Sequence, residues 1–195
     1  MYWLACQLIK DQIIDFTKGN MSMYKGLIQL PETKYLGFGI MMPWENNLEI
    51  QFNLWQKAMV SEKMKMLKKL CGSEQAIGIF CYRCDVETHT FSYHIACENK
   101  RNAVSTEFEE LKIYAGTYAR FENECQDLSN RFECYNDLCD EIWGRWLPNS
   151  EYVSLIELET LGCVEGYALL EIYYPDNPTN IPYQLEMLLP VRTQA

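Results

Sequence analysis

The chain has 195 residues, of which 48% are hydrophobic and 23% are charged, the composition of a folded globular domain. Its net charge is −10, and residues 98–165 hold 15 acidic and 6 basic side chains, a net charge of −9. No apolar run reaches the ~18–20 residues that a membrane span needs. The negative charge argues against direct nucleic-acid binding, which needs clustered Lys and Arg. A solvated surface explains the acidity, and a surface for a basic partner is the alternative.

Nine cysteines are spread along the chain without a regular spacing, and the N-terminus lacks the basic segment of a signal peptide. We therefore expect a cytoplasmic protein whose reduced thiols serve as small hydrophobic groups. Cys81, Cys84, His89 and His94 form a C-x2-C-x4-H-x4-H pattern, but the gap between the pairs is too short for a zinc finger. Strand residues three apart also point to opposite faces. Neither a metal site nor a cofactor is expected.

Hydrophobic spacing predicts a short helix at 3–16, within an N-terminal helical extension at 1–24. Residues 25–42 follow as a strand pair or one bent strand, with Pro31 at an edge or a bulge. A helix is then expected from Asn46 or Asn47 to about Leu70. Its buried stripe consists of Leu48, Phe52, Trp55 and Met59.

Residues 76–83 and 91–98 have the composition of two strands joined by a polar loop. Another strand signal covers 108–122, and a helix is predicted from about Ser129 to Trp146, ended by Pro148. The last two strands are expected at 167–174 and 183–191, with three prolines between them.

The order strand, helix, strand, strand thus occurs twice, at about 26–98 and 108–192. Two such modules place two main helices on one face of an antiparallel sheet, so the predicted fold class is α+β. One domain at 25–195 is expected, with a ligand pocket at its centre.

Glu171 is the most informative residue because it lies in the apolar run 168–174. An ionised carboxylate in such surroundings costs several kcal/mol unless a base, a proton or a bound cation compensates it. Glu186 repeats the situation at 184–189. The alternative is that both carboxylates lie on a solvated strand face. Aromatic rings that attract cations flank both acids in the sequence: Tyr167, Tyr173, Tyr174, Tyr183, Trp143 and Trp146.

Several segments resemble the GyrI-like, or effector-binding, superfamily. This superfamily includes the drug-sensing C-terminal domains of AraC-type and MerR-type activators and stand-alone gyrase-inhibitory proteins. The resemblance covers about 26–192 and rests on the order and spacing of six short motifs, none decisive alone. They are Leu54-Trp55-Gln56, Ile77-Gly78-Ile79, Gly116-Thr117-Tyr118-Ala119, the run from Trp146 to Tyr152, Leu170-Glu171-Ile172-Tyr173 and Leu185-Glu186-Met187.

The resemblance implies roles for particular positions. In drug-sensing relatives a buried Glu on the next-to-last strand contacts cationic aromatic ligands, and Glu171 matches it. Tyr183 occupies the place of a pocket tyrosine, and Tyr118 matches a Gly-x-Tyr position that is structural or lines the pocket. Phe52 and Ile77 fall where some relatives have pocket tyrosines, so a more apolar wall is implied.

Two segments depart from the pattern of the relatives. Residues 153–166 are longer than the relatives imply, and only about 25 residues precede the module where transcriptional relatives carry a helix-turn-helix domain. Residues 1–24 are expected either to pack on the module or to pair two copies into a homodimer.

The first functional hypothesis is a stand-alone, non-enzymatic binding protein for amphipathic aromatic cations. Glu171 supplies the counter-charge, Glu186 is a candidate second one, and Tyr183, Tyr173, Trp143 and Trp146 are stacking walls. An enzyme that uses the same glutamate is the second hypothesis, because some stand-alone relatives resemble hydrolases of reactive, cyclopropane-type natural products. A protein-interaction module, as in gyrase-inhibitory relatives, is the third.

Overall fold

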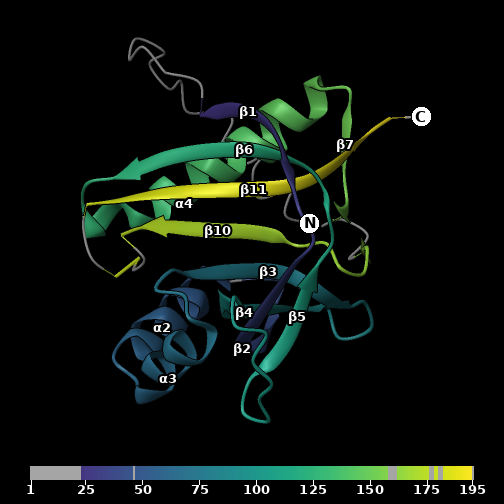
Figure 1. The fold of residues 1–195 in the computed structure, drawn as a ribbon. Coiled ribbons are helices and arrows are strands. Elements are labelled where there is room, and N and C mark those ends of the chain that lie inside the picture. Colours follow the sequence, from purple (N-terminus) through teal and green to yellow (C-terminus); the bar gives the residue numbers. More distant parts are fainter. Residues whose placement is uncertain (1–22, 46, 158–161, 176–177, 180–181, 195) are drawn as a thin grey trace.

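The computed structural model describes residues 23–45, 47–157, 162–175, 178–179 and 182–194, so the helix expected at 3–16 lies outside the described residues. Most of the described strands form one antiparallel sheet in the order β1-β6-β11-β10-β3-β4-β2-β5, and short β7 pairs with β11 (Figure 1). β8 and β9 form a separate hairpin. The strands are β1 Tyr24–Leu30, β2 Thr33–Pro43, β3 Ala76–Asp85, β4 Thr90–Glu98, β5 Glu109–Ile113, β6 Gly116–Cys125, β7 Tyr152–Ser154, β8 Ile156–Glu157, β9 Gly162–Cys163, β10 Leu169–Tyr174 and β11 Tyr183–Thr193.

The two predicted modules have the same strand order. In the first half the order is β2-β4-β3, and in the second half it is β6-β11-β10. The modules join through β3 and β10, where Gly78 lies opposite Glu171. β1 and β5 extend the edges, each paired with a strand of the other half. The predicted α+β fold with duplicated modules is confirmed. The segment 25–42 forms two strands separated at Pro31, which pair with other strands and not with each other.

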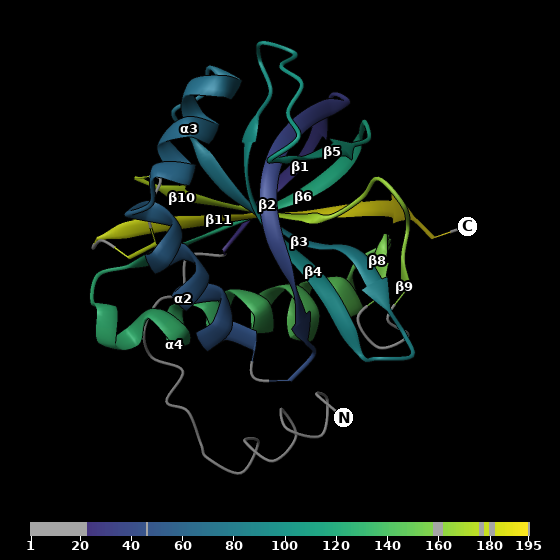
Figure 2. The same cartoon turned by 90° about the horizontal axis from the view of Figure 1, so that it is seen from below.

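The helices lie on one face of the sheet (Figures 1 and 2). They are α2 Asn47–Met59, α3 Glu62–Cys71, α4 Arg131–Cys139 and the π-helix η2 Asp140–Trp146, with short 3-10 turns at Leu128–Asn130 and Leu147–Asn149. α4 packs behind β6 and β11, and α2 and α3 lie beside the other half of the sheet. The helix-covered face is therefore formed by both modules.

The single helix expected at 47–70 is wrong, because two helices occupy that range. The break is at Ser61, whose backbone is extended (φ −89°, ψ 147°) and whose Oγ accepts a hydrogen bond from the Met64 N–H. A serine oxygen that caps the first free N–H groups starts a new helix. Val60, next to the break, is 83% exposed. Gly72 ends α3 in the left-handed conformation (φ 67°), as expected.

The regular helix expected to Trp146 also needs correction. It is α-helical only to Cys139, and from Asp140 the backbone widens. The Leu147 N–H then donates to the Ile142 carbonyl, five residues back rather than four. A widened turn rotates the following side chains away from the 3.6-residue pattern. The buried helix face predicted from the 3.6-residue spacing therefore does not extend in a straight line to Trp143 and Trp146, which follow the start of the widened segment.

Two apolar clusters lie on the two faces of the sheet. The larger one fills the space between the sheet and the helices and contains Trp55, Tyr93, Tyr135 and Tyr173. The smaller one contains Ile77, Leu111, Tyr118 and Leu188. It joins β5, at one end of the sheet, to β6, near the other end, so the sheet bends round this second cluster.

Replacement of Ser61 by Ala tests the origin of the helix break. The variant loses the cap of α3, so its free energy of unfolding should fall by about 1 kcal/mol. Urea unfolding followed by circular dichroism measures the change. Ser129→Ala is the matched control, because the Ser129 hydroxyl bonds to the exposed side chains of Asp127 and Asn130, and its change should stay within about 0.5 kcal/mol. Equal stability of the two variants would show that the cap does not hold α3.

Candidate functional site

Glu171 is buried at the seam between the modules. Its side chain is 0% exposed and lies on the helix-covered face of β10, between β3 and β11. Residues alternate along a strand, so Leu170 and Ile172 on either side of it point to the second cluster. The alternative stated above was that Glu171 lies on a solvated face of its strand. Its complete burial in this structure excludes that alternative.

Four hydrogen-bond donors surround the carboxylate. Oε2 accepts from Gln51 Nε2 at 2.6 Å, from Tyr93 Oη at 2.7 Å and from Tyr173 Oη at 3.1 Å. Oε1 accepts from Tyr135 Oη at 2.6 Å. The donors come from α2, β4, β10 and α4. We call Glu171 and these four residues the Glu171 cage.

A second layer of contacts orients the cage. The indole Nε1 of Trp55 donates to Tyr93 Oη at 2.8 Å, so the Tyr93 hydroxyl proton is directed to Glu171. Gln51 and Trp55 are four residues apart in α2 and therefore lie on the same face of that helix. The Trp55 ring also meets the Tyr173 ring edge to face at 5.4 Å. One helix face thus supplies both a direct donor and the group that positions another donor.

Gly78 leaves the room that the cage needs. A Cβ at this position would overlap the Tyr93 hydroxyl and lie 2.9 Å from Glu171 Oε2. Gly78 is directly opposite Glu171 in the β3–β10 ladder. The glycine of the Ile77-Gly78-Ile79 motif is explained by this close approach of side chains.

Burial raises the pKa of Glu171 to about 7, although the hydrogen bonds from Tyr135, Tyr93, Tyr173 and Gln51 act in the opposite direction. Burial raises the pKa values of the three tyrosines well above their usual range, so these residues remain protonated donors. Among the described residues, no Lys or Arg forms an ion pair with Glu171. The cage therefore holds a carboxyl group that changes its charge near neutral pH.

Gln51 Oε1 is a second acceptor in the cage and has no hydrogen-bond partner among the described residues. Gln51 itself is 0% exposed. A buried amide oxygen without a partner normally carries a free-energy cost of about 1–3 kcal/mol. The cage thus has one acceptor to offer to a group that is not part of the described chain.

Besides Glu171, five of the site residues predicted from the sequence lie on the helix-covered face of the sheet, and one of them belongs to the cage. Tyr173 belongs to the cage, and the Tyr183 ring meets it edge to face at 5.6 Å. Trp143 and Trp146 pack against the same core from η2. Phe52 lies on α2 and meets Phe132 of α4 edge to face at 5.4 Å.

The other predicted residues lie on the opposite face of the sheet. Ile77 and Tyr118 are buried in the second cluster. Glu186 pairs in register with Ile172 and is therefore also on that face. Its carboxylate forms an ion pair with Arg120 (Oε1 to Nε 2.8 Å) and accepts from Tyr174 Oη at 3.0 Å. The structure does not bring these three residues to Glu171.

Sequence reasoning missed three cage members: Gln51, Tyr93 and Tyr135. Each had a signal in the sequence. Gln51 is a polar residue on the buried side of the helix stripe, four residues before Trp55. Tyr93 and Tyr135 lie at inward positions of their predicted strand and helix, where a hydroxyl needs a partner. Their common target could not be known without the pairing of the modules.

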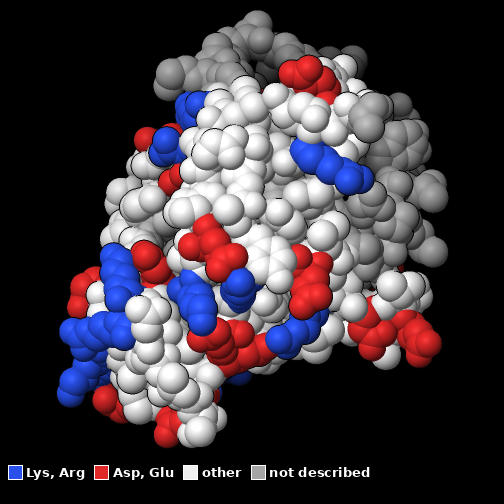
Figure 3. Space-filling model, turned by 45° about the vertical axis from the view of Figure 1, so that its right-hand side comes forward, with Lys and Arg blue, Asp and Glu red and all other residues white. Residues whose placement is uncertain are grey.

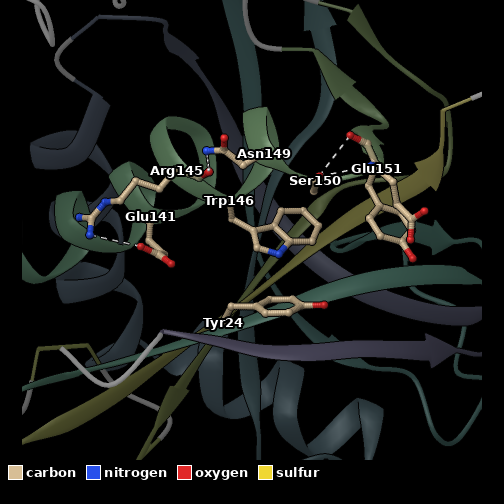
Figure 4. A pocket seen from close by; sticks show the side chains of 8 residues that line it. Tyr24, Glu141, Arg145, Trp146, Asn149, Ser150 and Glu151 are labelled. Atoms are coloured by element: carbon tan, nitrogen blue, oxygen red, sulfur yellow. Dashed lines mark hydrogen bonds and ion pairs between the residues drawn. The ribbon is translucent and has the colours of Figure 1, made fainter.

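A separate surface hollow of about 530 Å³ lies beside Trp146, and Glu171 does not line it. Figure 4 shows the Trp146 ring next to Tyr24, with Arg145 and Glu141 paired to one side. The Tyr152 ring stacks on Trp146 at a centroid distance of 5.9 Å. Trp146, predicted as a wall of one pocket, thus faces this hollow as well as the core.

Charged side chains on the face drawn in Figure 3 are mixed, with Lys and Arg next to Asp and Glu in its lower half. Ion pairs of the described chain include Lys34–Glu110, between β2 and β5, and Lys112–Glu32, between β5 and the turn from β1 to β2, both at 3.0 Å. Exposed pairs of this kind contribute only about 0–1 kcal/mol each. No helix in the described part of the chain is long and apolar enough to cross a membrane.

Comparison with known proteins identifies the domain. The family model for Cass2, described as "integron-associated effector binding protein", matches residues 26–191. No curated protein matches the sequence.

Several solved structures share the fold. SAV2435 bound to tetraphenylphosphonium is similar, with 15% identity and a TM-score of 0.62 over 87% of this chain and 93% of that one. A putative transcription regulation protein of Staphylococcus aureus MU50 has 16% identity and a TM-score of 0.60, over 87% and 97%. An integron cassette protein of Vibrio cholerae has 16% identity and a TM-score of 0.54, also over 87% and 97%. At these identities the similarity establishes the fold.

Replacement of Gly78 by Ala tests the packing of the cage. The added Cβ forces the Tyr93 hydroxyl and Glu171 apart, so the free energy of unfolding should fall by about 1–3 kcal/mol. Gly144→Ala is the matched control, since a Cβ there meets nothing within 4 Å and alanine favours a helix. Urea denaturation measures both. An unchanged stability in Gly78→Ala would contradict the described packing.

The raised pKa of Glu171 predicts a pH-dependent stability. The folded protein binds this proton more tightly than the unfolded chain, so the stabilisation is complete below about pH 4.5 and is lost as the pH rises to about 7. The shift corresponds to about 3 kcal/mol. The free energy of unfolding of the wild type, relative to Glu171→Gln, should fall by that amount between pH 4.5 and pH 8. A constant difference across this range would exclude a raised pKa.

Proposed function

The chain belongs to the Cass2 family of integron-associated effector binding proteins, and we propose from this that it binds a lipophilic aromatic cation, with Glu171 as the counter-charge. The observation that carries the proposal is a fully buried carboxyl group with a pKa of about 7 and no basic partner among the described residues. A cation that enters such a site interacts strongly, because the surrounding protein screens charge less than water does.

The aromatic rings around the cage support a cationic ligand. Five rings, those of Trp55, Tyr93, Tyr135, Tyr173 and Tyr183, lie in the same buried cluster as the Glu171 cage. A ring face attracts a desolvated cation by about 2 kcal/mol. The structurally similar SAV2435 has been solved with tetraphenylphosphonium, a cation of this class. Charge and ring chemistry together favour delocalised cations with aromatic groups.

Glu171 has no exposed surface, so a ligand reaches it only after neighbouring side chains move. The proposed entrance lies between α2 and α4, because these helices each contribute one donor to the cage, Gln51 and Tyr135. The two helices meet through the rings of Phe52 and Phe132. The Arg131 guanidinium lies over both rings, at 5.2 Å and 4.8 Å from their centroids.

Arg131 occupies a position that a ligand cation would also favour. Its Nε is buried and has no hydrogen-bond partner among the described residues, and its guanidinium lies over the two rings. In the proposed binding step the Arg131 side chain moves to solvent, the two phenylalanine rings separate, and Gln51 turns its free Oε1 towards the ligand. Glu171 gives up one or more of its donors and remains ionised beside the bound cation.

Calorimetric titration with tetraphenylphosphonium tests the proposal. The wild type should bind at pH 8, and Glu171→Gln should bind at least tenfold more weakly, because the neutral amide cannot balance the charge. Glu186→Gln is the matched control. This variant removes a similarly buried strand carboxylate on the opposite face of the sheet. Its affinity for tetraphenylphosphonium should stay within about twofold of the wild-type affinity.

The pH and the sign of the ligand charge provide two further readouts. Only the ionised fraction of Glu171 attracts the cation, and this fraction rises from about 0.1 at pH 6 to about 0.9 at pH 8, so the affinity should rise about tenfold. Tetraphenylborate, with the same four rings and a negative charge, should not bind. Equal affinity of the wild type and Glu171→Gln at pH 8 would overturn the proposal.

A further inference from the structure

Three cysteines meet near the end of β3. Cys81 and Cys84 are on β3, and their Sγ atoms are 3.0 Å apart. Cys163 is on β9, which packs against β3, and its sulfur shares hydrogen bonds with both other thiols. We call Cys81, Cys84 and Cys163 the thiol cluster. It lies apart from the Glu171 cage and has no role in the proposed binding step.

A bulge in β3 creates the cluster. Residues three apart on a regular strand point to opposite faces, so Cys81 and Cys84 were expected to lie apart. The pairing of β3 with β4 shifts its register between Phe80 and Cys84. Cys81 adopts a left-handed conformation with φ 61°, which is uncommon for a residue with a Cβ. Three residues of β3, 81–83, thus face the single β4 residue Ser92, and the two extra residues allow the two sulfurs to meet.

The histidines of the same sequence pattern do not join the cluster. His94 Nε2 pairs with Glu109 Oε2 at 3.1 Å, and the carbonyl of His89 accepts from the Trp44 N–H in a turn. In the described part of the chain, no group of three or more Cys, His, Asp or Glu side chains is arranged to hold a metal ion. The cluster is therefore best described by thiol chemistry.

The three sulfurs differ in charge and access. Hydrogen bonds from the Cys81 and Cys84 thiols lower the pKa of Cys163 strongly, and the same bonds raise the pKa values of Cys81 and Cys84. These hydrogen bonds favour Cys163 as the first of the three thiols to ionise. Cys163 and Cys84 are half-buried, whereas Cys81 has no exposed surface. Cys163 and Cys84 are thus the two sulfurs of the cluster with exposed surface for a small oxidant.

We propose that the thiol cluster is a peroxide-reactive site in which Cys163 is oxidised first and then forms a disulfide with Cys84. The Cys163 thiolate attacks one oxygen of hydrogen peroxide, the O–O bond breaks, and a sulfenic acid and hydroxide result. The Cys84 sulfur then attacks the Cys163 sulfur, the S–O bond breaks, and the Cys84 proton leaves with the hydroxyl group as water. Together the two cysteines lose two electrons, and the peroxide gains these two electrons.

The disulfide would join β9 covalently to β3. These strands are far apart in the sequence, and β3 also carries Gly78, the residue opposite Glu171. Oxidation thus links the hairpin β8–β9 to the strand at the seam between the modules. Thiol reductants such as dithiothreitol should reverse the link, because exchange needs access to only one of the two half-buried sulfurs.

Peptide mapping after oxidation tests the proposal. Folded wild-type protein is treated with hydrogen peroxide, its free thiols are alkylated, and it is digested with trypsin. Cleavage after Arg83 separates Cys81 from Cys84, so the expected product joins peptide 84–100 to peptide 146–192. Dithiothreitol should separate the two. Cys84→Ser and Cys163→Ser should each abolish this product, and Cys97→Ser should retain it, which excludes the other cysteine of peptide 84–100.

The chain contains an internal control for the chemistry. Cys125 and Cys134 also contact each other, but burial raises the pKa of Cys134, which disfavours its thiolate. Peptides 121–131 and 132–145 should therefore remain unlinked under the same treatment. A dimedone adduct at Cys163 in the Cys84→Ser variant should reveal the sulfenic acid. The proposal is overturned if no 84–163 link forms, or if Cys81 and Cys84 are linked equally fast in wild type and Cys163→Ser.

Discussion

The carboxylate of Glu171 needs hydrogen bonds because it has no contact with water, and the arrangement of the two modules supplies them. Gln51 comes from α2, Tyr93 from β4, Tyr135 from α4 and Tyr173 from β10. A buried carboxylate without such donors would cost several kcal/mol. Both helices must therefore lie close to the seam between β3 and β10. The cage therefore packs the two modules together, and its carboxyl group is also the group that titrates near neutral pH.

Glu171 and Glu186 show how the alternation of a strand decides the role of a residue. Both carboxylates lie in apolar runs, and each is nearly or fully buried. Glu171 faces the helices and is solvated by neutral donors, which leave its charge available. Glu186 faces the other way and is neutralised by Arg120. Composition alone does not separate these cases, because most of the partners come from helices and strands that are distant in the sequence.

The predicted elements were mostly correct because apolar periodicity and turn residues are local signals. The strands at 76–83, 91–98, 167–174 and 183–191 and the duplicated order all occur. Errors arose where a local hydrogen bond overrides periodicity, as at Ser61, or where a helix widens, as at Asp140. Part of the site was also predictable, since Glu171, Tyr173 and Tyr183 lie together. Gln51 and Tyr135 required knowledge of how the helices are placed.

The sequence by itself determined the fold class, the two modules and the presence of two carboxyl groups in apolar runs, because each follows from the order and spacing of residues along the chain. Only the tertiary structure decided which groups meet. The pairing of β3 with β10 placed Gly78 opposite Glu171, and the packing of α2 and α4 added two donors. A single bulge at Cys81 turned two separated thiols into neighbours. Long-range strand pairing and local bulges set these contacts, and neither leaves a periodic trace in the sequence.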